Sequence, residues 1–374
     1  MIRRTELEAR DPALLDTTLA HLRALVGFDT RNPPRAIGPD GIFDYLRAQL
    51  PGFEVDVSDH GAGAVSLFAT RGTPKLLFNA HLDTVPDSPQ WSAGPFELRV
   101  TDDRAIGLGA CDIKGAAAAL LAAANASQGD MALLFTTDEE GADPRCVKTF
   151  LAGQPRFANV IVAEPTRCLA VLAHRGIQSV RVRFEGRAGH ASSEQKPSDS
   201  ALHQAVRWSV AALDFAESQS AKNFGELRGM RFNLGRIEGG IKANVIAPEA
   251  ELRFGMRPLP SVEMDGLLED LRMLVEPAPA AFEESFRGPP LPASAANAES
   301  CLRDARALAQ GLDIPVGNAV DFWTEAALFS QAGCMTFVYG PGDIAQAHSA
   351  DEWVALDELE TAARTYLRIT EKSS

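Results

Sequence analysis

Apolar residues recur along the chain at helical spacing in some segments and in short continuous runs in others. Leu15, Leu19 and Leu22 share one face of a helix that begins after Asp11 and Pro12, an N-cap residue followed by a first-turn proline. Short apolar runs, such as residues 76–78, are typical of buried strands. The first 165 residues alternate between the two kinds of segment, which predicts α/β layers. We expect helices at 13–26, 42–50 and 115–125, and strands at 53–57, 65–70, 75–79, 131–136 and 160–163.

The pattern changes in the second half of the chain. Apolar and charged residues alternate one by one over residues 180–185, which predicts a strand with one buried face. The following strands (230–234, 252–256) and helices (201–216, 262–274) predict a small α+β unit of about a hundred residues, with two helices on one face of a sheet. The proline-rich stretches 277–282 and 287–294 then predict a return linker. After it we expect helices at 296–310, 325–331 and 356–369 and a strand at 335–339.

These elements predict a mixed-sheet α/β domain, formed by residues 1–175 and 288–374, with a smaller α+β domain inserted at 176–287. A length of 374 residues exceeds one ordinary core, which also favours two domains. Hydrophobic residues make up 45% and charged residues 23%, and both values are typical of globular proteins.

Charge and cysteine usage narrow the partners and the compartment. The net charge of −14 argues against nucleic-acid binding, because phosphate neutralisation needs clustered Lys and Arg. We find no run of about 18 apolar residues and no signal core at the N-terminus, so no membrane partner is expected. The five cysteines are scattered and form no C-x-x-C pair, which favours reduced thiols in a cytoplasmic protein.

Candidate chemistry gathers at the predicted strand ends and in the loops beside them. Buried carboxylates at such density repel one another unless cations hold them. Two histidines with three or more carboxylates suit a pair of Zn²⁺, Co²⁺ or Mn²⁺ ions, which can share one carboxylate and activate a water. A neighbouring carboxylate that binds no metal would then take the proton of that water. The positions are His81, Asp112, Asp138, Glu139, Glu140, Glu164 and His348.

Each position also has a simpler explanation when taken alone. Residues 138–143 could form a solvated acidic turn, Asp112 could cap the following helix, and Glu164 could simply end a strand. His81 and Asp83 form a common triplet, in which the carboxylate could fix the tautomer of the imidazole. All of these positions lie beside strand ends, and their occurrence together favours a metal centre.

The stretches that carry these residues resemble the M20 family of di-metal aminoacylases, deacetylases and exopeptidases. The resemblance follows the family's order and spacing along nearly the whole chain. It rests on HLDTVP (81–86), GLGACDIKG (107–115), DEE (138–140), Glu164-Pro165 and His348.

The resemblance implies a ligand set and a catalytic pair. Glu139 would be the general base and acid, and Asp83 would be the hydrogen-bond partner of His81. The implied ligands are His81, Asp112 and Glu164 for one metal and Asp112, Glu140 and His348 for the other, with Asp112 as the bridge.

The resemblance also assigns roles within the inserted domain, which carries lid and dimer contacts in this family. His190, in GRAGHAS, would stabilise the oxyanion, often from the partner subunit of a homodimer; without the family it is a loop histidine. Asn244 would contact the substrate. Arg257 would grip the substrate's α-carboxylate, which suits a bidentate guanidinium, although the residue could also be a surface charge at a strand end.

Within the family, residues 322–329 and 339–353 resemble the acetylornithine deacetylase branch. Residues 32–53, 172–177 and 318–326 are similar to its subgroup that acts on N-acetyl-L-citrulline in arginine biosynthesis. One departure from the wider family is Leu108, where an arginine is common between two glycines. The expected activity is hydrolysis of the acetyl amide of this small-molecule N-acetyl amino acid, with two divalent ions, Zn²⁺ or Co²⁺. The alternatives are N-acetyl-L-ornithine deacetylation, a dipeptidase or carboxypeptidase, and a non-catalytic metal-binding dimer.

Overall fold

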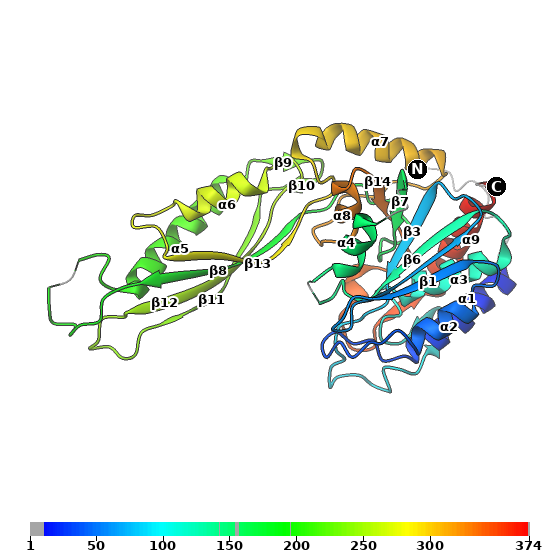
Figure 1. Ribbon diagram of the computed structural model, residues 1–374, viewed down its shortest axis with the longest axis horizontal. Coiled ribbons are helices and arrows are strands. Elements are labelled where there is room, and N and C mark those ends of the chain that lie inside the picture. Colours follow the sequence, from blue (N-terminus) through cyan, green and yellow to red (C-terminus); the bar gives the residue numbers. More distant parts are fainter. Residues whose placement is uncertain (1–10, 142, 154–156, 195, 373–374) are drawn as a thin grey trace. The chain divides into compact units, whose positions relative to one another are not determined.

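The computed structural model describes residues 11–141, 143–153, 157–194 and 196–372. The chain divides into two compact units (Figure 1). Unit 1 contains the residues up to Leu172, Arg303–Gly317 and the residues from Thr324 onward; unit 2 contains Ala173–Leu302 and Asn318–Trp323. The domain limits inferred from the sequence stay a prediction, and the names unit 1 and unit 2 refer below to these two groups.

Unit 1 is built on a six-stranded mixed sheet, as the sequence predicts. The strand order is β1-β2-β6-β3-β7-β14, in which β6, β3, β7 and β14 run parallel and β1 and β2 pair antiparallel. The carboxyl ends of the four parallel strands therefore meet at one edge of the sheet. The strands are β1 (Glu54–Asp59), β2 (Val65–Arg71), β3 (Leu76–His81), β6 (Met131–Thr136), β7 (Asn159–Val162) and β14 (Met335–Val338).

Helices cover both faces of this sheet. Neighbouring residues of a strand point to opposite faces, and in these apolar strands both faces therefore carry side chains that must be buried. The ring of Phe78 packs edge-on against Tyr366, with ring centroids 5.4 Å apart. Leu77 points the other way and lines an apolar cavity with Phe150 and Phe329. The first face carries α1 (Pro12–Val26), α3 (Lys114–Ala126) and α9 (Leu356–Lys372), and the second carries α4 (Arg145–Ala152) and α8 (Ala326–Gln331). Two further helices are α2 (Ile42–Ala48) and α7 (Ala298–Gly311).

The first turn of the alanine-rich helix α3 packs closely against the loop that precedes it. A side chain at Gly115 would place its Cβ 2.4 Å from the carbonyl oxygen of Ala110, well inside van der Waals contact. This close fit fixes the start of α3, and with it the loop that precedes the helix.

A small three-stranded sheet in unit 1 joins segments that lie far apart in the sequence. Its order is β15-β5-β4, with β4 at Arg99–Val100, β5 at Arg104–Ile106 and β15 at Trp353–Ala355. The strands are two or three residues long, so they show no alternation that the sequence analysis could detect. The pairing of β15 with β5 brings the chain near residue 352 beside the chain near residue 107.

Unit 2 contains a four-stranded antiparallel sheet in the order β11-β12-β8-β13. The strands are β8 (Ile177–Glu185), β11 (Arg231–Gly239), β12 (Glu249–Arg257) and β13 (Ala281–Gly288). The helices α5 (Ala201–Ser218) and α6 (Met264–Arg272) pack on one face, where Trp208 is fully buried near Phe184 and Phe254. A short hairpin of β9 (Asn223–Phe224) and β10 (Leu227–Arg228) completes the unit's strands. The predicted sheet with two helices on one face is confirmed.

The two stretches predicted as a linker overlap the ends of the edge strand β13 (Ala281–Gly288), so the linker prediction is wrong for residues 281–282 and 287–288. Phe282 and Phe286 are four residues apart with three polar residues between them. The pairing with β8 shifts register between Glu284 and Phe286. Such a bulge breaks the period of two on which strand prediction depends.

Short 3₁₀ turns occur at Ala295–Asn297 and Ile344–Gln346. In the described part of the chain, no helix combines the length and the apolar character that a bilayer crossing requires.

Candidate metal centre

The parallel strands of unit 1 bring most of the predicted ligands together. His81 is the last residue of β3, the 138–140 turn follows β6, and Glu164 lies two residues beyond β7. Since β6 and β7 are the two neighbours of β3, these side chains gather at one edge of the sheet. The topology alone therefore places a histidine and four acidic residues at one edge of the sheet.

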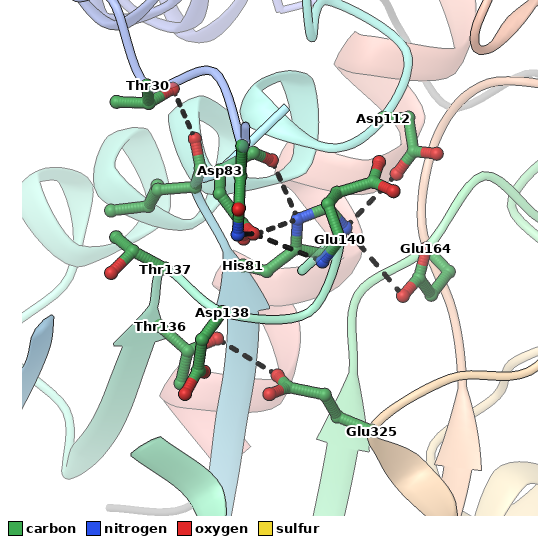
Figure 2. Close-up of polar contacts among 12 residues, drawn as sticks. Thr30, His81, Asp83, Asp112, Thr136, Thr137, Asp138, Glu140, Glu164 and Glu325 are labelled. Carbon is green, nitrogen blue, oxygen red and sulfur yellow. Dashed lines mark hydrogen bonds and ion pairs between the residues drawn. The ribbon is translucent and has the colours of Figure 1, made fainter. Parts of the chain in front are cut away.

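Two loops supply the remaining donors. Asp112 lies just before α3, and its side chain reaches both histidines: Oδ1 is 3.1 Å from His81 Nε2, and Oδ2 is 3.2 Å from His348 Nε2. His348 Nε2 also lies 2.9 Å from Glu140 Oε1. Glu164 Oε1 is 3.9 Å from His81 Nε2 (Figure 2). All of the predicted ligands thus lie side by side.

These donors form two triads that share one carboxylate. His81, Asp112 and Glu164 make the first, and Asp112, Glu140 and His348 make the second; the donor atoms of each lie within 4.8 Å of one another. Imidazole nitrogen and carboxylate oxygen are the ligands that zinc-like ions prefer, and a shared carboxylate is typical of two-metal sites. The separation of Glu164 from His81 exceeds a hydrogen bond, which suits an ion between them. The residues present therefore fit a pair of divalent cations.

The electrostatics of the cluster also call for cations. Hydrogen bonds to Asp112 and Glu140 raise the pKa of His348 to about 11. Burial lowers the pKa of His81, but the bonds to Asp112 and Asp83 outweigh it and the net shift is upward. Burial and the nearby Asp112 raise the pKa of Glu164 well above its usual value. In the metal-free cluster, protons bound to these side chains offset the negative charge of the carboxylates, and metal ions would displace those protons.

Asp83 connects the first triad to the second. The His81 Nδ1–H donates to the backbone carbonyl of Asp83 at 3.0 Å, and the Asp83 carboxylate lies 3.4 Å from the same nitrogen. The other carboxylate oxygen accepts hydrogen bonds from Asn32 Nδ2 at 2.9 Å and from the Glu140 backbone N–H at 3.1 Å. The expected partner of His81 therefore also anchors the turn that carries Glu140.

Glu139 lies in the same turn, between Asp138 and Glu140, whose carboxylates have other hydrogen-bond partners. Burial raises its pKa well above the usual value, and the carboxylates of Glu140, Glu164 and Asp112 add to the shift. Glu139 belongs to neither triad, so its carboxylate is available to exchange a proton.

The three residues predicted to meet the substrate all belong to unit 2. His190 is exposed, and its Nδ1 lies 2.7 Å from Ser192 Oγ. The structure brings the His190 segment beside that of Asn244, whose carbonyl accepts the Ala191 backbone N–H at 3.1 Å. Arg257 is half-buried at the end of β12.

Buried polar residues that the sequence analysis missed surround the predicted set. The Glu352 carboxylate accepts three backbone N–H groups of residues 109–112, and burial raises its pKa to about 7. Glu325 Oε2 accepts a hydrogen bond from Thr136 Oγ1 at 2.9 Å, and burial raises its pKa to about 8 (Figure 2). Neither residue stands at the end of a long predicted strand, which was the signal used to find the others.

A comparison with family models identifies the fold's relatives. Residues 77–372 match the model described as peptidase family M20/M25/M40. The chain belongs to the M20 peptidase family. The resemblance inferred from the motifs is therefore confirmed, including its branch, because curated relatives in the M20 family carry deacetylase names.

Two such relatives illustrate the similarity. The chain is 64% identical over 358 residues to the N-acetyl-L-citrulline deacetylase of Xanthomonas campestris pv. campestris, a match that covers 95% of this chain and 98% of the relative. It is 31% identical over 324 residues to the acetylornithine deacetylase of Vibrio vulnificus, which covers 83% of this chain and 84% of the relative.

Solved structures of other M20 proteins share the fold. Aminopeptidase PepT of Bacillus cereus aligns with a TM-score of 0.71 at 18% identity, covering 96% of this chain and 98% of that one. A dinuclear metal-binding peptidase of the M20 family from Bacillus subtilis aligns with a TM-score of 0.62 at 14% identity, covering 96% and 99%. At such low identities these likenesses speak for the fold alone.

Proposed function

We propose that this M20 family enzyme hydrolyses the acetyl amide of N-acetyl-L-citrulline to acetate and L-citrulline. The observation that carries the proposal is the 64% identity to a deacetylase of that name over nearly the full length of both chains. The two donor triads in unit 1 support it, because amide hydrolysis at neutral pH requires an activated water.

In this proposal His81, Asp112 and Glu164 hold one divalent ion, and Asp112, Glu140 and His348 hold the second. When bound, the two ions, Zn²⁺ or Co²⁺, would polarise the acetyl carbonyl and lower the pKa of a water. Asp83 keeps the His81 imidazole in one orientation and tautomer, because its backbone carbonyl accepts the Nδ1–H.

Glu139 carries the proton in both halves of the reaction. It takes a proton from the attacking water as the new carbon–oxygen bond forms. It then gives this proton to the amide nitrogen as the carbon–nitrogen bond breaks, so that the amine leaves neutral. Glu139 belongs to neither triad, which leaves its carboxylate available for both steps.

Three residues of unit 2 have proposed roles toward the substrate. His190 donates a hydrogen bond to the developing oxyanion. Arg257 pairs with the α-carboxylate of the substrate, and Asn244 contacts the substrate from the turn whose backbone is hydrogen-bonded to Ala191.

Three other functions are alternatives to this proposal. The 31% relatives favour N-acetyl-L-ornithine as a second candidate, which differs by an ammonium in place of the neutral ureido group. A dipeptidase or carboxypeptidase is less favoured, because the peptidase structures resemble the chain only in fold. A non-catalytic metal-binding protein is disfavoured by the presence of Glu139.

Acetate release tests the proposal. N-acetyl-L-citrulline, N-acetyl-L-ornithine and a dipeptide panel are compared with added Zn²⁺ or Co²⁺ and with a chelator. Metal-dependent turnover that favours citrulline is expected. Preference for ornithine would move the enzyme to the parent branch, and turnover of peptides alone would overturn the deacetylase assignment.

We also propose that the enzyme works as a homodimer through unit 2. The outer face of α5 exposes Val206, Val210 and Leu213, each about half accessible to solvent. These three side chains line a surface groove together with Leu234 and Ile237 of β11. Since β11 is an edge strand of the sheet, its backbone groups can pair with a second copy.

Sedimentation of Val210→Asp tests the dimer, with Val100→Asp as a control at an exposed valine of unit 1. Val210→Asp should shift the enzyme to monomer and Val100→Asp should not. A cytoplasmic location stays a prediction, supported by five cysteines that are all free thiols.

A further inference from the structure

Glu352 is a buried carboxylate in unit 1 whose partners are all backbone groups of one loop. It is 1% exposed and lies directly before β15. Oε2 accepts the Gly109 backbone N–H at 3.0 Å, and Oε1 accepts those of Cys111 and Asp112, each at 2.9 Å. The Glu352 carbonyl also accepts the Gly107 N–H at 3.0 Å. One residue thus binds the loop that ends in Asp112 at four points.

Glu352 lies four residues after His348, in the same loop. We propose that Glu352 is a positioning residue that holds the loop of Asp112 in register with the loop of His348. These loops contribute ligands to the second triad, whose third ligand, Glu140, follows strand β6. The first triad depends less on this link, because His81 ends β3 and Glu164 follows β7.

The geometry requires a carboxylate rather than an amide side chain. Three N–H donors converge on the two oxygens, and only a carboxylate accepts on both. A glutamine in this place keeps the two bonds at one oxygen but turns its NH₂ group toward the Gly109 N–H, so that two donors face each other. The loop has little freedom to adjust, since a Cβ at Gly109 would lie 2.6 Å from Thr84 Cγ2.

A second buried carboxylate provides the matched control. Glu360 is 4% exposed and also accepts a backbone N–H, that of Asp11 at 2.8 Å. Asp11 caps the start of α1 and supplies no donor to either triad. The same Glu→Gln change at the two sites therefore separates the loss of a buried carboxylate from the loss of this particular link.

The inference rests on the proposed metal centre, and Co²⁺ binding tests it without substrate. Glu352→Gln, Glu360→Gln and the wild type are titrated with Co²⁺ by calorimetry and by visible absorption, and the thermal unfolding of each metal-free protein is recorded. In Glu352→Gln the second Co²⁺ should bind about 10–100-fold more weakly, which is the usual effect of removing a residue that orients a ligand, and the first should change less than threefold. Glu360→Gln should bind both ions as the wild type does.

Kinetics give a second readout. The Glu352→Gln enzyme should need more Co²⁺ for half-maximal activity and regain part of its kcat at saturating Co²⁺, with KM for substrate unchanged. Unchanged binding of the second ion, or equal weakening in both variants, would overturn the inference. If Glu352→Gln fails to fold, Glu352→Asp keeps the charge but shortens the reach, and the same selective loss is expected of it.

The two proposals fail in different ways. A wild type that binds two Co²⁺ ions without releasing acetate refutes the deacetylase function and leaves the role of Glu352 testable by titration. A wild type that binds fewer than two ions refutes the metal centre and the role of Glu352 together.

Discussion

The predicted metal centre of unit 1 and the predicted substrate residues of unit 2 are built in different ways. In unit 1, His81 and Asp112 are almost fully buried, and their side chains contact one another directly. In unit 2, His190 and Asn244 are exposed, and what joins them is a backbone hydrogen bond between their segments. Side chains that fix one another hold a geometry before anything binds, whereas exposed side chains remain free to adapt. Variants of the two units should therefore fail in distinguishable ways.

The largest effect is expected at Glu139. Glu139→Gln keeps the size of the side chain but removes the proton acceptor, so kcat should fall about 10²–10⁴-fold. Binding of Co²⁺ should stay near the wild-type level, because Glu139 belongs to neither triad. Acetate release and metal titration check both statements. A rate within a few-fold of the wild type would refute the assignment of the base.

His190→Ala in unit 2 should lower kcat about 10²–10³-fold, the usual cost of one oxyanion donor, without changing metal binding. If His190 acts across the subunit interface, mixing His190→Ala with Glu139→Gln chains should restore some activity. Verified heterodimers that show no recovery would contradict cross-subunit catalysis. A loss of Co²⁺ affinity in His190→Ala would contradict the expectation that variants of unit 2 leave metal binding unchanged.

Asp83→Asn should weaken metal binding about 10–100-fold, because its amide group would face the donors Asn32 Nδ2 and Glu140 N–H. Asp87→Asn is the control, since Asp87 pairs with Arg31 in a partly exposed ion pair and contacts neither triad. Calorimetric titration with Co²⁺ measures the difference. Equal affinities in the two variants would show that Asp83 does not orient the centre.

The smallest effect concerns pH. In the metal-free protein the pKa of His348 is raised to about 11, so its bond to the carboxylates adds stability that is full below about pH 6.5 and is lost as pH rises through 11. A metal ion must displace that proton. Co²⁺ affinity should therefore rise between pH 6 and 9, with proton release seen by calorimetry in two buffers. An affinity that does not change with pH would contradict the protonated state.

Long periodic segments of the fold could be predicted from the sequence, and short or irregular ones could not. The strand at Met131–Thr136 has the predicted bounds, and α1 and α5 begin within one residue of theirs. The strands β4, β5 and β15 are too short to show a period, and the bulge in β13 hides its alternation. Amphipathic spacing reports burial on one face, so elements without that spacing leave no signal.

The candidate site divides in the same way. Predicted ligands such as His81 and Glu164 follow apolar strands, and that position made them predictable from the sequence. Glu352 and Asn32 act through groups more than fifty residues away in the sequence, and no local pattern indicates such pairings. Sequence patterns thus found the residues that would touch the metals, and Asp83 two residues from one of them, but missed the positioning residues that lie far away in the sequence.

The sheet of unit 1 has a consequence for synthesis on the ribosome. Strand β14 pairs in parallel with β7, but about 170 residues of chain, including all of unit 2, are made between them. At roughly 5–20 residues per second, β7 is synthesised about 10–35 s before β14, and the edge that β14 later covers stays unpaired during that time. An unpaired apolar edge invites association with other nascent chains during that interval. The last ligand, His348, is made later still, so the nascent chain cannot take up its full complement of ions until its final residues emerge.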